Sequence, residues 1–253
     1  MKYYPRLVDL GCFTRDDVEG MTGNRATAHS VIEAYKKKGL IESVRRDLFV
    51  TMSLETKQPV VNRYAIASHA ASGAYVAYHS ALEYHGLANQ AYYEVYVASK
   101  SRFRTFEHGG LTYRHVASPL DIGLDVKNDI RVTDLERTVI DGINNFEKVG
   151  GLEEFLLCIE MMPYLDSRKL IDYLIMYNTV FLYQKSGYIL EHYQEALKLP
   201  DTFFDVCRNK ITKSTRYLYG TLQRESHVHN KSWALYTPVD LLAVTRKGAS
   251  HNE

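Results

Sequence analysis

The residues best suited to chemistry are cations and small polar side chains in the segment 21–46. This segment holds six cations and two anions, a local net charge of +4, whereas the whole chain carries only +1. Clustered cations bind phosphates, and small hydrogen-bonding side chains among them can read the edges of bases. The pattern therefore favours contact with a nucleic-acid duplex, provided that a regular element presents these residues together.

Three short helices are predicted to carry this segment. Apolar residues recur at i, i+3, i+4 and i+7 from Ala28 to Tyr35, the spacing of an amphipathic helix, and Gly39 ends it. A shorter helix should precede it, with Thr14 as its N-cap. Leu7 and Leu10 indicate a first helix that closes a small core.

Two strands, 40–44 and 48–50, are expected to flank a basic turn after these helices. Three helices followed by such a hairpin predict a winged helix-turn-helix in residues 1–56. In that fold the second helix of the motif enters the major groove while wing cations contact phosphates. The residues expected at bases are Arg25, Thr27, His29 and Ser30, and those expected at phosphates are Lys36, Lys37, Arg45 and Arg46. A protein-docking role is the alternative.

The remaining residues, 57–253, are predicted to form a second domain after a polar connection that contains Pro59. Residues 57–145 read as mixed α/β and residues 146–253 as mostly helical, so the predicted fold class is α+β. The expected strands are 94–99, 102–106, 111–116 and 130–132, and the expected helices are 152–161, 167–177 and 180–197.

Catalytic interpretations of this second domain are weaker than structural ones. His79, Ser80, Glu83 and His85 could suggest metal or nucleophilic chemistry, but Ser80 and Glu83 fit a helix capping box. The segment 133–136 fits a second capping box. The chain has no glycine-rich phosphate loop, so we expect no enzyme activity, metal or cofactor. The least implausible nuclease set is Glu94, Lys100, Asp134 and Glu136, and Arg137 with Asp141 should form an ion pair.

A second basic region, 207–231, holds six cations and one anion, and the closing stretch around it adds Tyr217, Tyr219, Trp233 and Tyr236. Such mixtures occur where single-stranded nucleic acid binds, and they equally suit an acidic protein face. The cations are Arg208, Lys210, Lys213, Arg216, Arg224 and Lys231. Cys12, Cys158 and Cys207 are far apart and predict small buried side chains. No membrane span or secretory signal is evident, so a cytoplasmic location and no membrane contact are expected.

Three segments together resemble the AbiEi family of antitoxins from type IV toxin-antitoxin abortive-infection (phage defence) systems. They are YHSALEYHGL (78–87), VTDLERTVID (132–141) and LYQKSGYILE (182–191), and they follow the basic hairpin. The resemblance implies that the N-terminal domain binds inverted repeats in its own promoter and represses its operon. It also implies that the C-terminal domain counteracts a nucleotidyltransferase toxin without a stable complex, which makes the second basic region a possible antitoxicity surface.

One position departs from that family. Its members often carry Arg-Gly-x-Tyr at the hairpin, whereas this chain has Arg46-Asp47-Leu48-Phe49. The aspartate tolerates the turn but places a negative charge beside the wing cations. Two rivals to the antitoxin hypothesis remain open: a nuclease-like enzyme on the mixed sheet, and a plain transcriptional regulator whose C-terminal domain senses a ligand or a protein.

Overall fold

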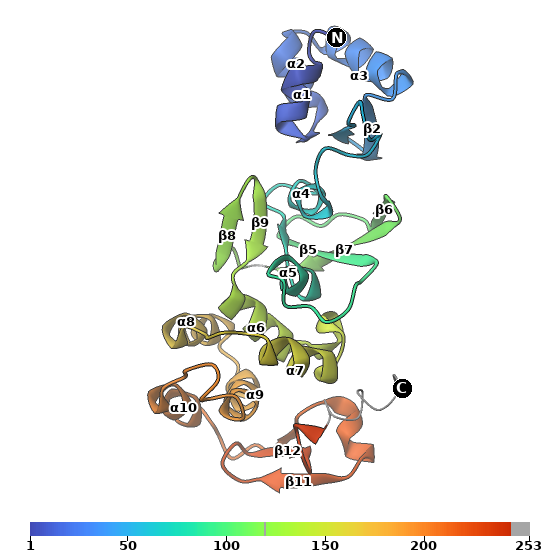
Figure 1. The fold of residues 1–253 in the computed structure, drawn as a ribbon. Coiled ribbons are helices and arrows are strands. Elements are labelled where there is room, and N and C mark those ends of the chain that lie inside the picture. The colour runs from blue at the N-terminus through green and yellow to red at the C-terminus, as the bar shows by residue number, and fades with distance from the viewer. Residues whose placement is uncertain (119, 244–253) are drawn as a thin grey trace, which may run out of the picture. The chain divides into compact units, whose positions relative to one another are not determined.

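The computed structural model describes residues 1–118 and 120–243 and shows a mixed α+β protein (Figure 1). The chain divides into two compact units, and each is described by itself. Unit 1 comprises Met1–Ser80 and Tyr92–Val132, and unit 2 comprises Ala81–Ala91 and Thr133–Glu253. The boundary expected after residue 56 falls inside unit 1, and the proposed domain division stays a prediction.

Unit 1 begins with three helices and a small sheet, and the predicted helices and hairpin strands are all present. The three-stranded sheet has the order β1-β3-β2, with both pairs antiparallel. The two-residue strand β1 was not predicted. These elements are α1 (Tyr4–Leu10), β1 (Cys12–Phe13), α2 (Arg15–Thr22), α3 (Arg25–Lys37), β2 (Ile41–Arg45) and β3 (Leu48–Thr51).

Local capping fixes where α2 and α3 begin. The Thr14 hydroxyl accepts a hydrogen bond from the Asp17 backbone N–H, and the Asp17 carboxylate accepts one from the Thr14 N–H, which completes a capping box. Asn24 caps α3 by accepting from the N–H groups of Ala26 and Thr27. The predicted Thr14 cap is therefore confirmed, whereas Asn24 was not foreseen.

The helices and the hairpin share one apolar core. Val18 of α2 and Ile32 of α3 are almost fully buried there, together with Leu7 and Phe49. Leu10 is an exception to the sequence expectation, because it is 41% exposed. The core lies under one face of α3, so the opposite face of that helix is left to solvent.

The rest of unit 1 is built on a six-stranded mixed sheet of order β6-β7-β5-β4-β9-β8. Strand β5 pairs in parallel with β7 and antiparallel with β4, and β4 is parallel to β9. Strands β4 and β8 were not predicted, and the expected strand 102–106 is wrong, since β6 begins only at Phe106. The elements here are α4 (Arg63–Ser68), β4 (Tyr75–Val76), β5 (Glu94–Ser99), β6 (Phe106–His108), β7 (Leu111–Ala117), β8 (Leu124–Lys127) and β9 (Ile130–Thr133).

The predicted cap at Ser80 is wrong. Helix α5 (His79–Tyr84) already includes Ser80, whose buried hydroxyl accepts a hydrogen bond from the Tyr96 N–H of strand β5. His79 is also buried and pairs through Nε2 with the Glu94 carbonyl. Both side chains therefore hold α5 against the sheet. The Ser80 hydroxyl bonds a backbone group of strand β5 instead of capping its own helix.

Unit 2 is helical for most of its first half, as the 3.6-residue period predicted. Helix α8 has the predicted bounds, α9 ends six residues before the expected Leu197, and α10 after Pro200 was missed. The elements are α6 (Leu135–Asn144), η1 (Phe146–Val149), α7 (Leu152–Glu160), α8 (Ser167–Tyr177), α9 (Val180–Glu191) and α10 (Asp201–Arg208).

The end of unit 2 is a small sheet rather than more helix. Strand β12 lies in its centre, parallel to β10 and antiparallel to β11. Trp233, fully buried, packs so closely on Gly187 of α9 that a Cβ there would lie 2.0 Å from its ring. The elements are β10 (Arg216–Tyr217), η2 (Gly220–Arg224), β11 (His227–Asn230) and β12 (Leu235–Pro238).

The three cysteines are buried and free, as predicted. Burial raises the pKa of the Cys12 thiol to about 12, so this sulfur is a poor nucleophile. Among residues 1–118 and 120–243, no helix has the length and apolar character needed to cross a membrane.

Candidate functional site

The exposed face of α3 gathers the side chains that the sequence analysis assigned to base contacts. Arg25, Thr27, His29 and Ser30 are all exposed. The Ser30 hydroxyl donates to the Ala26 carbonyl of its own helix at 3.0 Å. Because the buried face of α3 lies in the core, this polar face is available to a partner along the length of the helix.

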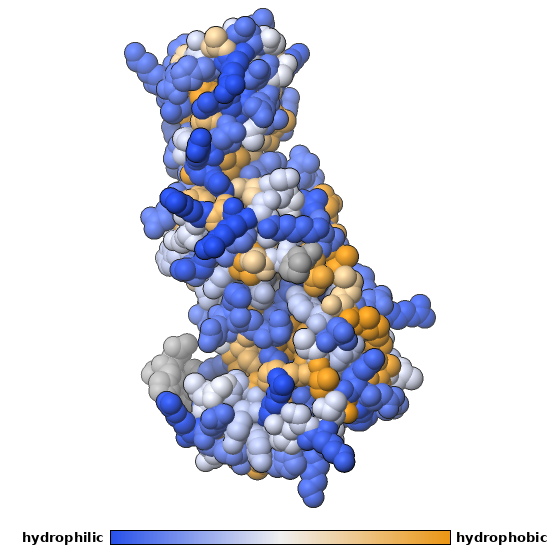
Figure 2. Space-filling model, turned by 180° about the vertical axis from the view of Figure 1, so that it is seen from behind, coloured by the Kyte–Doolittle hydropathy of each residue, from blue (hydrophilic) through white to orange (hydrophobic). Residues whose placement is uncertain are grey.

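Cations continue this face at the C-terminal end of α3. Lys36 and Lys37 are exposed in its last turn. Lys36 forms an ion pair with Glu33 at 3.3 Å, and both side chains are largely solvated. Such an exposed pair contributes little to stability and yields readily to a phosphate. On the face seen in Figure 2, the N-terminal part of the molecule, at the top, is mainly hydrophilic.

The hairpin turn consists of Arg46 and Asp47, because Arg45 pairs with Leu48 across the strands. Arg46 is exposed. Asp47 has φ +61°, the left-handed conformation that aspartate tolerates, and its carboxylate accepts from the Arg15 N–H at 3.2 Å. The carboxylate thus lies at the N-terminus of α2, where the helix dipole favours a negative charge.

Arg45 lies in a different environment from its neighbour. Its guanidinium stacks over the rings of Phe103 and Phe106, at 5.2 and 5.5 Å from their centroids, and donates to the Ala70 carbonyl. The side chain is half-buried. Arg45 therefore joins the hairpin to the larger sheet of unit 1, through the two rings and the Ala70 carbonyl.

The cations of the second basic region are all exposed in unit 2. Arg208 pairs with Glu191 and Asp205 and lies over the Trp233 ring. Arg216 stacks on Phe181, 5.3 Å from its centroid. The other four form no ion pair within the described part of the chain: Lys210, Lys213, Arg224 and Lys231.

Aromatic side chains of this region are divided between core and surface. Trp233 is buried and cannot stack on a base, whereas Tyr217 and Tyr236 are half-buried and stack on each other at 4.7 Å. His227 and His229 pack against the edge of that stack. The small sheet thus combines accessible rings with nearby cations.

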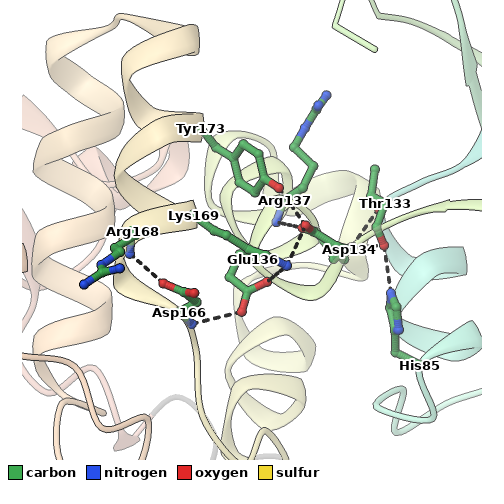
Figure 3. A network of polar contacts seen from close by, with 10 residues as sticks. His85, Thr133, Asp134, Glu136, Arg137, Asp166, Arg168, Lys169 and Tyr173 are labelled. Atoms are coloured by element: carbon green, nitrogen blue, oxygen red, sulfur yellow. Dashed lines mark hydrogen bonds and ion pairs between the residues drawn. The ribbon is translucent and has the colours of Figure 1, made fainter. Parts of the chain in front are cut away.

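In unit 2 a network of hydrogen bonds and ion pairs holds Asp134 and Glu136, two of the carboxylates considered for a nuclease (Figure 3). Asp134 caps α6 by accepting from the Arg137 N–H, and its other oxygen accepts from Lys169 at 3.1 Å and from the Tyr173 hydroxyl at 2.6 Å. Glu136 accepts from the Asp166 N–H at 2.9 Å and from Lys169 at 3.3 Å.

This geometry corrects the second predicted capping box. The N-cap is Asp134, one residue after the expected Thr133, and Glu136 reaches the start of α8 instead of its own helix. The Thr133 hydroxyl instead pairs with that of Thr138 at 2.7 Å. The network is a tertiary joint between α6 and α8.

Lys169 compensates the negative charge of that joint. Partial desolvation lowers the pKa of Lys169, but its hydrogen bonds and charge interactions with Asp134 and Glu136 outweigh this effect and raise it. Burial, and then the hydrogen bond to Asp134, raises the pKa of Tyr173. Lys169 therefore stays charged and Tyr173 stays un-ionised near neutral pH, which suits a structural role.

The remaining nuclease candidates are also engaged. Glu94 pairs with Arg114 and Lys100 pairs with Asp121, both within unit 1. Across the described residues, no three His, Cys, Asp or Glu side chains come together as a metal site would need. The predicted Arg137–Asp141 ion pair is confirmed at 3.0 Å, with both side chains nearly inaccessible.

The sequence analysis missed the role of Lys169, because a lysine three residues after the N-cap of α8 gives no local sign of its partners Asp134 and Glu136. It also missed the hydrogen bond from the Arg15 N–H at the start of α2 to the Asp47 carboxylate. Both contacts join elements far apart in the sequence, and neither has a local signal.

No family model and no curated protein sequence matches this chain. The fold is similar to that in a crystal structure of the RV2827C protein from Mycobacterium tuberculosis, with a TM-score of 0.62. The match covers 94% of this chain and 89% of that chain at 11% sequence identity. At this identity the similarity shows a shared fold and nothing about activity.

Proposed function

We propose that this chain is an antitoxin and operon repressor of the AbiEi kind, in which residues 1–56 act as a winged helix on double-stranded DNA of its own promoter. The observation that supports DNA binding is the exposed polar and cationic face of α3, whose opposite face lies in the core. This arrangement leaves a complete helix face for a groove.

The proposed contacts follow from the position of each side chain along α3. Its 13 residues span about 20 Å, which fits the major groove of a duplex. Arg25 and Thr27 in the first turn, with His29 and Ser30, are the proposed base readers. Lys36, Lys37 and the hairpin Arg46 are the proposed phosphate contacts. Arg45 is left out, because it is committed to Phe103 and Phe106.

The antitoxin part of the proposal rests on the resemblance of the three sequence segments. Several polar side chains of these segments are buried; in unit 2 Asp134 accepts from the Arg137 backbone N–H, and the Arg137 side chain pairs with Asp141. The segments therefore specify the frame of unit 2, and the exposed cations around its small sheet are the proposed antitoxicity surface. We expect no stable complex with the nucleotidyltransferase toxin.

The two adjacent arginines of the hairpin provide the sharpest test of DNA binding. Fluorescence anisotropy would measure the affinity of the full chain for DNA from upstream of its own gene across a series of salt concentrations. Arg46→Ala should reduce the slope of log affinity against log salt by about 0.9, because one fewer counterion is released. Arg45→Ala should leave the slope unchanged. A slope that Arg46→Ala does not alter would contradict the wing assignment.

Base reading is tested separately on the same DNA and on a shuffled duplex of equal composition. Arg25→Ala should lower the preference for the upstream DNA by roughly tenfold, which is the range for one bidentate base contact. Lys37→Ala should instead weaken binding to both duplexes alike. Equal losses on both duplexes for Arg25→Ala would remove α3 from base recognition.

Antitoxin activity is tested by co-expressing the full chain with the nucleotidyltransferase encoded by its neighbouring gene. The Arg46→Ala variant should still protect cells, whereas a Lys210→Ala, Lys213→Ala double variant should lose protection and keep its DNA affinity. If the unaltered chain gives no protection, the antitoxin proposal fails and the plain-regulator alternative is favoured, whatever the result with DNA.

A further inference from the structure

A cavity of about 1030 Å³ lies within unit 2, away from the carboxylate joint described above. Its walls come from the end of α6 with η1, from α9, and from the segment that joins β10 to η2. This volume is at the upper end of the range that small-molecule sites occupy. The proposed DNA contacts lie in unit 1, and the proposed antitoxicity surface shares only Arg216 with the cavity lining.

Aromatic side chains supply much of the cavity lining. Phe146 and Phe181 lie on the helical side, and Tyr217 and Tyr219 lie on the β10 side. Such rings offer flat apolar surfaces on which a planar ligand can stack. Asn144 and Asn145 add side-chain amides that can hydrogen-bond the edge of such a ligand.

Lys185 places a cation in this lining, and its side chain is almost inaccessible from outside. The residue is 4% exposed, and its ammonium donates to the carbonyls of Ile143 and Asn144 at the end of α6. An ammonium has three donors, so one remains after these two bonds. No carboxylate of the described chain pairs with Lys185, and burial lowers its pKa to about 8.

A second cation lies against the same ring. The Lys185 ammonium is 5.1 Å and the Arg216 guanidinium 5.3 Å from the centroid of Phe181. Glu147 is the one acidic side chain among the residues that line the cavity. The cavity thus carries a net positive charge, and its buried cation lacks a counterion, a combination that favours an anionic occupant.

We propose that this cavity binds a small organic anion with a planar aromatic ring. Its anionic group accepts hydrogen bonds from Lys185 and Arg216, and its ring stacks on the aromatic side chains of the cavity. An ion pair with Lys185 also offsets the cost of burying the charge of this side chain.

The test uses isothermal titration calorimetry of the full chain with 1-naphthalenesulfonate, a planar aromatic anion whose charge does not change with pH near neutrality. The matched neutral probe is 1-naphthalenesulfonamide, which has the same ring and nearly the same shape. The sulfonate should bind at least tenfold more tightly than the sulfonamide, as expected for charge-assisted hydrogen bonds. Equal affinities, or no binding of the sulfonate, would overturn the proposal.

Three variants assign the binding to this cavity. Arg216→Ala, at an exposed position, should weaken sulfonate binding roughly tenfold, and Lys185→Met should do so by a similar or larger factor. Arg224→Ala removes an exposed cation of the same region that does not line the cavity, and it should leave the affinity unchanged. If Arg216→Ala and Arg224→Ala have equal effects, the sulfonate is held by general surface charge and the site is refuted.

Discussion

The buried ion pair between Arg137 and Asp141 should be a main determinant of the stability of unit 2. The two side chains are 1% and 3% exposed, and the Arg137 Nε lies 3.0 Å from the Asp141 carboxylate. Burial raises the pKa of Asp141, and the charge of Arg137 and the hydrogen bond from Tyr177 oppose this shift. Arginine keeps its proton at any accessible pH, so its charge needs this carboxylate.

The perturbation is Asp141→Asn, which keeps the shape of the side chain and removes its charge. Removing the charged partner of a buried ion pair costs about 3–5 kcal/mol. If the free energy of unfolding falls by about 2 kcal/mol per molar urea, the urea concentration at the unfolding midpoint of unit 2 should fall by about 2 M. The double variant Arg137→Met, Asp141→Leu should lose less than the single one, because it buries no unpaired charge.

Trp233 provides a specific readout of unit 2. It is the one tryptophan of the chain and is fully buried in that unit, so its fluorescence follows the unfolding of unit 2. The control is Asp205→Asn, which breaks an exposed pair with Arg208 and should cost less than about 0.5 kcal/mol. If both variants shift the midpoint equally, the reasoning from burial is refuted.

Three further outcomes are expected. Gly187→Ala should destabilise unit 2 by about 1–3 kcal/mol in the same urea assay despite the better helix propensity of alanine, because the added Cβ would lie 2.0 Å from the Trp233 ring; an unchanged midpoint would show that the ring can move. The folded-state pKa of Lys185, about 8, is below its unfolded value of about 10.4. Between these two pH values the unfolded state therefore binds one proton more than the folded state. Stability of the wild type relative to Lys185→Met should therefore rise by about 3 kcal/mol from pH ~8 to pH ~10.4, and a flat difference would refute the shift. Asp47→Asn keeps the turn and removes a charge beside Arg46, so DNA affinity measured by anisotropy should increase at low salt and converge with the wild type at high salt.

Features that depend on neighbouring residues followed from the sequence. The period of apolar residues predicted α3 and α8, and the Thr14 N-cap predicted the start of α2, because these signals lie within one or two helical turns. The i, i+4 spacing likewise gave the Arg137–Asp141 pair. The exposed polar face of α3 is the complement of its apolar period, so it was predictable as well.

Where the local sequence allowed more than one helix cap or strand, tertiary contacts decided which one formed. Thr133 and Asp134 could each cap α6, and the partners Lys169 and Tyr173 favour the aspartate. Two-residue strands such as β4 and β10 have no period to detect, since their hydrogen-bond partners are remote in sequence.

The hairpin illustrates the same division most simply. Arg45 and Arg46 are identical in type and adjacent in sequence, so the sequence alone determined a basic turn and assigned both to one role. Only the packing of the hairpin against Phe103 and Phe106 separates them, because a guanidinium stacked on two rings is no longer free to contact a phosphate, whereas its exposed neighbour is. The cavity around Lys185 was likewise invisible in the sequence, because its walls come from segments that meet only in the folded unit.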